Sequence, residues 1–192
     1  MQIPEIVHRA EALATAMRFE RSSLREVGRL LAMLAAQRSR GQFAEIGTGC
    51  GVGAAWIESA LSPEAALVTV EADTDRAAAV GRLFADRPRV RVLQGDWHEL
   101  LPLEAPFDLL FFDGGEWKRG DVIAESEAAL DLVAGGGTVV IDDMTPESQW
   151  PEEWRGRPDP VRDFWLGDPR LRAAEVLTTS STAAIIATKN PS

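Results

Sequence analysis

From Gln42 onward, short apolar runs alternate with stretches of helical periodicity, and this alternation narrows the possible folds more than any other feature. Strands are expected at 43–46, 67–71, 90–94, 107–112, 138–141, 173–178 and 183–188, with helices near 52–61, 75–86, 97–101, 121–133 and 160–166. Alternation of this kind builds a parallel sheet that helices cover on both faces. The sequence therefore predicts an α/β fold with a doubly wound, mostly parallel sheet of seven strands.

The two ends of the chain follow other patterns. Residues 4–19 and 22–37 carry apolar side chains at helical spacing, so two amphipathic helices should precede the sheet. Only "TSST" joins the last two strands, which is too short for a crossover, so the last strand should be antiparallel. The one long irregular segment, 145–160, carries Trp150 and Trp154, which argue for an ordered functional loop.

Composition limits the class of protein and its partners. A chain of 192 residues with 45% hydrophobic content suits one well-buried core, so we expect a single domain over residues 1–192. The formal charge of -10 argues against nucleic acid and favours small or positively charged partners. The chain has one cysteine, Cys50, and a charged N-terminal stretch, which indicate a cytoplasmic protein. It has no apolar run of roughly 20 residues, so we expect no membrane span.

The stretch "FAEIGTGCGVGAA", residues 43–55, forms a glycine-rich turn directly behind the first expected strand. A nucleotide-triphosphate loop would need Lys and then Ser or Thr after its last glycine, and neither is present. The dinucleotide fingerprint would need its third glycine at Val52, so this motif fits only loosely. The acid Glu45, two residues ahead of Gly47, is also an unfavourable neighbour for a polyanion.

Each of the first five expected strands carries an acid at or near its carboxyl end: Glu45, Glu71 with Asp73, Asp96, Asp113, and Asp142 with Asp143. Singly, such acids cap the helices that follow. Together, at one edge of the sheet, they would repel one another unless a ligand supplies cationic groups, hydroxyls or a metal ion. We therefore expect a shared site for a ligand that is part nucleoside and part zwitterionic amino acid, which is S-adenosylmethionine.

At this point the chain resembles the class I S-adenosylmethionine-dependent methyltransferases, which have a Rossmann-like fold, and within them the metal-dependent O-methyltransferases related to catechol O-methyltransferase. The resemblance covers about residues 43–143. It rests on "FAEIGTGCGVGAA", "VTVEAD", "VRVLQGD", "FDLLFFDGG" and "GGGTVVIDDM", in that order and spacing. It implies a cofactor-binding half over 42–144, preceded by the helices of 1–40 and followed by a substrate-side loop and hairpin over 145–192.

The resemblance also implies roles for single residues. In the family, the glycines allow close approach to the methionine part of the cofactor, and the acid after the second strand binds the ribose. The resemblance places the cofactor site of this chain on Glu45, Gly47, Thr48, Gly49, Gly51, Glu71, Ala72, Gly95, Asp96, Trp97 and Asp113. Magnesium, or manganese or calcium, would be bound by Asp113, Asp142 and Asp143. Lys118 and Asp113 are the catalytic candidates, with His98 as a second possible base.

The chain departs from the family at two positions and leaves several alternatives open. Asp143 stands where the family usually has asparagine, and Lys118 follows Asp113 by five residues instead of three. Asp142 and Asp143 either bind a metal or only begin a turn. Trp117, Trp150 and Trp154 either rim a pocket for an apolar or aromatic substrate or close the core beneath a lid.

The expected activity is methylation of a hydroxyl on a small molecule, with aromatic compounds as one candidate class of substrate. The alternatives are a metal-independent methyltransferase acting on nitrogen or oxygen, a nicotinamide-dependent oxidoreductase, and a binding module without catalysis. The helix at 4–19 packs either on its own domain or against a second copy in a homodimer.

Overall fold

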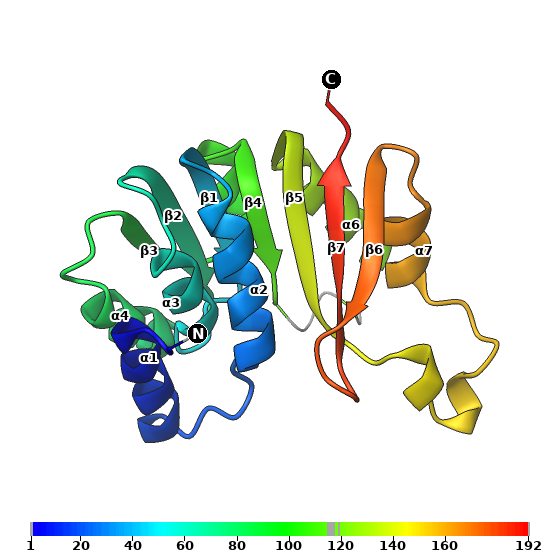
Figure 1. Ribbon diagram of the computed structural model, residues 1–192, viewed down its shortest axis with the longest axis horizontal. Helices are drawn as coiled ribbons and strands as arrows, with labels where there is room; N and C mark the ends of the chain where they lie inside the picture. The colour runs from blue at the N-terminus through cyan, green and yellow to red at the C-terminus, as the bar shows by residue number, and fades with distance from the viewer. Residues whose placement is uncertain (1, 115–117, 119, 192) are drawn as a thin grey trace.

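A computed structural model of the chain describes residues 2–114, 118 and 120–191. Helices and strands alternate along most of it (Figure 1), in the order α1 (Glu5–Ala16), α2 (Arg25–Ala36), β1 (Arg40–Ile46), α3 (Val52–Glu58), β2 (Glu64–Glu71), α4 (Thr74–Leu83), β3 (Val90–Gln94), α5 (Trp97–Leu100), η1 (Leu101–Leu103), β4 (Phe107–Phe112), α6 (Val122–Asp131), β5 (Val133–Met144), η3 (Glu147–Gln149), η4 (Glu152–Trp154), α7 (Pro160–Gly167), β6 (Leu171–Leu177) and β7 (Ala183–Lys189).

The seven strands form one sheet in the order β3-β2-β1-β4-β5-β7-β6. The pairs among β1 to β5 are parallel, whereas β7 lies antiparallel between β5 and β6. The predicted fold class and the antiparallel last strand are confirmed. Strand order reverses between β1 and β4, and in open α/β sheets ligands bind at such a switch point, beyond the carboxyl ends of the strands.

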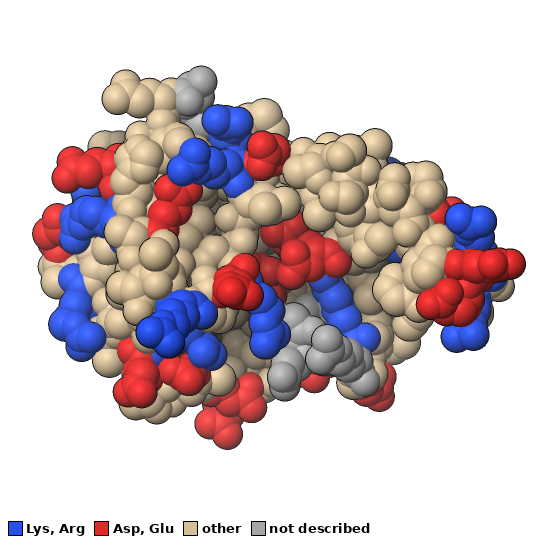
Figure 2. All heavy atoms as spheres, turned by 90° about the horizontal axis from the view of Figure 1, so that it is seen from below, with Lys and Arg blue, Asp and Glu red and all other residues tan. Residues whose placement is uncertain are grey.

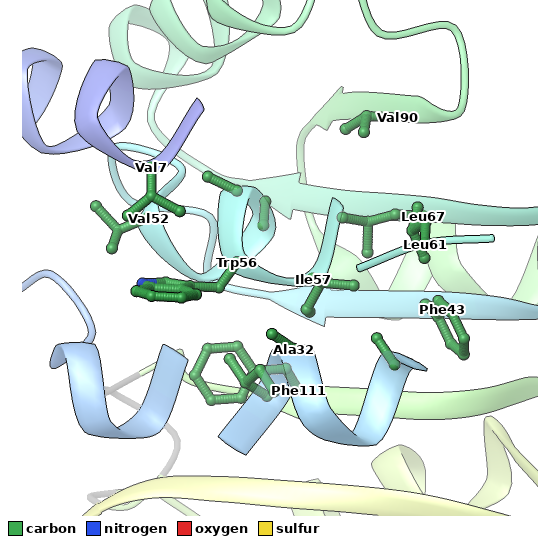
Figure 3. Close-up of a cluster of buried hydrophobic side chains, with 14 of the residues drawn as sticks. Val7, Ala32, Phe43, Val52, Trp56, Ile57, Leu61, Leu67, Val90 and Phe111 are labelled. Atoms are coloured by element: carbon green, nitrogen blue, oxygen red, sulfur yellow. The ribbon is translucent and has the colours of Figure 1, made fainter. Parts of the chain in front are cut away.

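The sheet carries one hydrophobic cluster on each face. The first joins α1, α2, α3 and α4 to the sheet, and the second joins η1, α6 and α7 to the other face. In the first cluster the ring of Trp56 points from α3 toward α2 (Figure 3), and a Cβ on Gly28 of α2 would lie 2.1 Å from Trp56 Cδ1. The glycine thus lets the two helices approach closely. Trp56 and Trp165 are both fully buried, as core residues should be.

The N-terminal helices are shorter than the predicted ranges 4–19 and 22–37. Helix α1 ends because Arg18 adopts a left-handed conformation with φ 54°, while the Phe19 amide donates to the Ala14 carbonyl and the Arg18 amide to the Thr15 carbonyl. This paired arrangement closes a helix C-terminus and turns the chain away from the helix axis. Residues 17–24 consequently form a connecting segment, called here the α1–α2 segment.

Helix α1 packs within its own chain. Three of its buried side chains, Ile6, Val7 and Ala10, belong to the hydrophobic cluster that also contains residues of α3 and α4. Since this apolar face is already covered, it is not available for the pairing with a second copy that the sequence left open.

Other bounds also differ from the expectation: β1 begins at Arg40 instead of residue 43, β2 at Glu64 instead of residue 67, and α3 ends at Glu58 instead of residue 61. Strand β5 begins at Val133 instead of residue 138, and its pairing with β4 shifts register between Phe107 and Leu109. The segment 145–160 contains the two short turns η3 and η4 and extends past β6 and α7 in Figure 1. Within the described ranges, no helix has the length and apolar character that crossing a membrane requires.

Candidate functional site

A cavity of about 1030 Å³ opens at the carboxyl edge of the sheet, around the switch point between β1 and β4. Figure 2 looks onto this side of the molecule and shows acidic side chains gathered near its middle. The predicted site residues that line the cavity are Gly47, Thr48, Gly49, Glu71, Ala72, Gly95, Asp96, Trp97, Asp113 and Asp143. Residues that lie far apart in the sequence are therefore brought to one site, as the acids after successive strands predicted.

The glycine turn after β1 forms one wall of the cavity. Gly47 has φ 91° and Gly49 has φ 54°, a backbone region that side chains disfavour. A Cβ on Gly47 would lie 2.8 Å from the Gly114 amide nitrogen, and one on Gly49 would lie 2.8 Å from Phe19 Cε1. Gly51 does not line the cavity; it caps α3 in a left-handed conformation. Two of the glycines thus shape the cavity wall, and the third starts the helix.

Glu71 ends β2 with its carboxylate at the cavity wall, where the side chain is only 7% exposed. Its Oε2 accepts a hydrogen bond from the Gly49 amide at 2.7 Å. Its Oε1 accepts from the Asp73 amide at 2.9 Å and from Arg76 Nη2 at 2.9 Å. This bond to Glu71 raises the pKa of the Arg76 guanidinium further. The acid is held rigidly beside the glycine turn, as a binding acid should be.

Beside Glu71, after the neighbouring strand β3, the cavity is lined by Asp96 and Trp97 at the start of α5, together with Glu125 of α6. Asp96 caps α5 by accepting from the His98 amide, and this bond together with the His98 side chain lowers the pKa of Asp96. His98 Nε2 lies 3.2 Å from Glu125 Oε2, and the His98 ring stacks on Trp97 at 3.8 Å. His98 is thus engaged by Asp96, Glu125 and Trp97, and it does not line the cavity.

Asp113, Asp142 and Asp143 come together after β4 and at the end of β5, with one oxygen of each within 4.8 Å of the others. Asp113 is half-buried, Asp142 is buried, and Asp143 is exposed with φ 59°. Burial, then the charges of Asp142 and Asp143, raise the pKa of Asp113 well above its usual value; burial raises that of Asp142 to about 6. Three acids so close together favour a bound cation.

Lys118 lies beside this acidic cluster. Its Nζ donates to the backbone carbonyl of Asp142. Burial lowers the pKa of its ammonium group, although the charges of Asp143, Asp113 and Asp142 oppose that shift. Lys118 follows Asp113 by two residues more than the family spacing. Its side chain nevertheless reaches the end of β5.

Glu45 does not occupy the place that the sequence suggested. It does not line the cavity and is 1% exposed, with Oε2 accepting from Thr69 Oγ1 at 2.6 Å. The Ala54 amide, in the first turn of α3, also donates to it, and burial raises the pKa of Glu45 to about 8. Its hydrogen bonds to Thr69 and to the Ala54 amide hold it within the protein, where it anchors the start of α3.

The tryptophans of the 145–160 segment do not line the main cavity. Trp150 donates from Nε1 to the Thr145 carbonyl at 3.0 Å and lines a separate cavity of about 300 Å³, while Trp154 is 47% exposed. Trp117 lies outside the described residues.

The cavity includes residues of the α1–α2 segment that sequence reasoning missed: Phe19, Arg21, Ser22 and Ser23. Ser23 Oγ donates to Asp113 Oδ2 at 3.2 Å, so this segment reaches the acidic cluster. The helical spacing on both sides concealed it, and the run of four polar residues at 20–23, where the two amphipathic stretches meet, was the available signal.

Comparison with known proteins agrees with this geometry. The model of a family described as "Methyltransferase domain" matches residues 44–144. A protein of Mycobacterium tuberculosis (strain H37Rv), named "Probable O-methyltransferase Rv1220c", is 29% identical over 167 residues, which cover 84% of this chain and 66% of that protein. The match thus spans slightly less than two thirds of that relative's length.

Solved structures share the whole fold. An O-methyltransferase of Bacillus cereus in complex with S-adenosylhomocysteine superposes with a TM-score of 0.81 at 20% identity, covering 99% of this chain and 93% of that one. The O-methyltransferase TomG of Streptomyces achromogenes, in complex with S-adenosylmethionine, gives a TM-score of 0.78 at 22% identity over 98% and 91% of the two chains. The fold is therefore that of class I methyltransferases, and the chain belongs to the methyltransferase domain family.

Proposed function

We propose that the protein is an S-adenosylmethionine-dependent O-methyltransferase that acts on a hydroxyl of a small molecule with the help of a divalent metal ion. The observation that carries the proposal is one cavity that joins a glycine turn and a buried acid, Glu71, to a cluster of three carboxylates. The names of the relatives and structural neighbours support the same activity.

The cavity walls fit the cofactor in their donors and acceptors. Gly47 and Gly49 leave room for close approach, Glu71 is an acceptor for ribose hydroxyls, and Asp96 with Trp97 offers an acceptor and an aromatic face to adenine. S-adenosylmethionine would supply an electrophilic methyl group on a positively charged sulfonium. The acids around the cavity favour that charge over the phosphates of a nicotinamide cofactor.

The three aspartates fit a hard cation. Each is an oxygen ligand. Their mutual repulsion, which adds to burial in raising the pKa of Asp113, would be relieved by a divalent ion. A bound magnesium or manganese ion would supply a Lewis acid that lowers the pKa of a coordinated hydroxyl. With aspartate at 143 instead of asparagine, the site carries one more negative charge than the usual family set.

Lys118 is our candidate for accepting the proton that the hydroxyl loses. Burial favours its neutral, proton-accepting form, and the bond from Nζ to the Asp142 carbonyl holds the amine at the acidic cluster. Ser23 would steady Asp113 on the opposite side through its hydrogen bond.

Methyl transfer to a panel of catechol-like and simple phenols tests the proposal, with magnesium and with chelator. We expect turnover that requires the metal. Asp142→Asn should lose at least about 10-fold in kcat/KM while S-adenosylmethionine binding changes little. Asp163→Asn, an exposed acid on α7, is the matched control. Equal turnover in chelator would point to the metal-independent alternative, and binding without transfer to any acceptor would favour a binding module.

A further inference from the structure

The carboxylate of Glu71 is already engaged by three donors of the protein itself. Gly49 N donates to Oε2, while Asp73 N and Arg76 Nη2 both donate to Oε1, at distances of 2.7 to 2.9 Å. An ionised carboxylate offers about four acceptor positions. Only one of them therefore remains for a ligand, on Oε2.

A ribose diol held through both hydroxyls needs two acceptor positions on the acid. Two of the three donors are backbone amides, fixed by the glycine turn and by the capped start of α4, where Asp73 accepts from the Arg76 amide at 2.9 Å. The third donor is the side chain of Arg76, which is 31% exposed. Arg76 is thus the donor that can leave Glu71 without any change in the backbone.

Arg76 has other partners that do not depend on Glu71. Its Nη1 lies 3.5 Å from Asp73 Oδ2, and its guanidinium carbon lies 5.3 Å from the centroid of the Phe19 ring. Phe19 in turn packs against Gly49 in the cavity wall. The guanidinium can therefore release the acid and still retain an ion pair and a cation–π contact.

We infer that Arg76 is a gate on the ribose subsite: it occupies an acceptor position on Glu71 that the cofactor's diol must take over. This inference rests on the proposed function. Under this inference Arg76 lowers the affinity for the cofactor, so that removing this polar residue from the cavity wall strengthens binding. A guanidinium that only positions Glu71 has the opposite effect.

Calorimetric titration with S-adenosylhomocysteine and with its 2′,3′-dideoxy counterpart tests the gate. Neither ligand carries the sulfonium charge. Loss of the positive charge of Arg76 therefore has little long-range effect on the binding of either ligand. Arg76→Leu should bind S-adenosylhomocysteine about 3- to 10-fold more tightly, the net scale of one typical hydrogen bond, and the dideoxy ligand with unchanged affinity. Arg76→Gln, a milder replacement, should shift affinity the same way. Arg82→Leu, an exposed arginine on the same helix, is the matched control and should change neither.

Weaker binding of S-adenosylhomocysteine by both Arg76 variants, with thermal unfolding as in the wild type, would overturn the gate and make Arg76 a positioning residue. An equal gain for both ligands would overturn it too, because the effect would not pass through the diol. If the wild type binds neither ligand, the proposed function itself fails, which is distinct from failure of the gate alone.

Discussion

Glu45 is a buried acid inside the first strand of the parallel sheet, only 1% exposed. Its charge type, next to the glycine turn, indicated a ligand with positive charge, yet the carboxyl is buried under the turn and hydrogen-bonded to Thr69. The sequence alone cannot distinguish an acid that faces the ligand from one that is buried under the turn. An acid inside an apolar strand can point either to the edge of the sheet or toward the start of the next helix. Glu71 and Asp113, at the ends of their strands, were predictable because the carboxyl ends of parallel strands meet at one edge.

The burial of Glu45 predicts a pH dependence of stability. Its pKa rises from an ordinary 4.5 to about 8 in the folded protein, so the folded state holds a proton that the unfolded state releases between those values. The free energy of unfolding should therefore fall as pH rises through this window, by up to about 1.4 kcal/mol per unit from this group. Urea unfolding of the wild type and of Glu45→Gln from pH 5 to 8.5 measures it. Parallel profiles for the two proteins would contradict the burial of a titrating Glu45.

At the scale of elements, the glycine turn between β1 and α3 depends on backbone space. Gly47→Ala would force a Cβ to within 2.8 Å of the Gly114 amide at a φ of 91°, so it should lower the free energy of unfolding by about 1–3 kcal/mol and weaken cofactor binding. Gly81→Ala is the matched control, since a Cβ on this exposed glycine of α4 meets nothing within 4 Å. That change should stabilise the helix by about 0.5–1 kcal/mol. Equal effects of the two substitutions on unfolding would refute the account of the turn.

The α1–α2 segment was the element that sequence reasoning missed. Apolar spacing continues from residues 4 to 19 and resumes at 22, so periodicity alone extends both helices, whereas Arg18 in a left-handed conformation ends the first. Strands β3 and β4 were predicted with their observed bounds. What periodicity cannot show is a helix end that depends on backbone hydrogen bonds, and here that end delivers Phe19 and Ser23 to the cavity.

For the whole molecule, the strand pattern and the short "TSST" link predicted the seven-stranded sheet with its antiparallel last strand. The position of the cavity followed from the acids at strand ends. The partners of the charged side chains in the cavity could not be predicted from the sequence. The pairing of Arg76 with Glu71, and of Lys118 with the Asp142 carbonyl, depends on side-chain packing.

The central claim is that this cavity binds S-adenosylmethionine, and calorimetric titration of the purified protein tests it most directly. Titrations with S-adenosylmethionine and with NADH, each with magnesium and with chelator, should show saturable binding of the first ligand only. Glu71→Gln should weaken that binding by about 1.5–3 kcal/mol, the scale of a lost hydrogen bond to a charged group. Binding of NADH without S-adenosylmethionine, or a Glu71→Gln variant with unchanged affinity, would contradict the account.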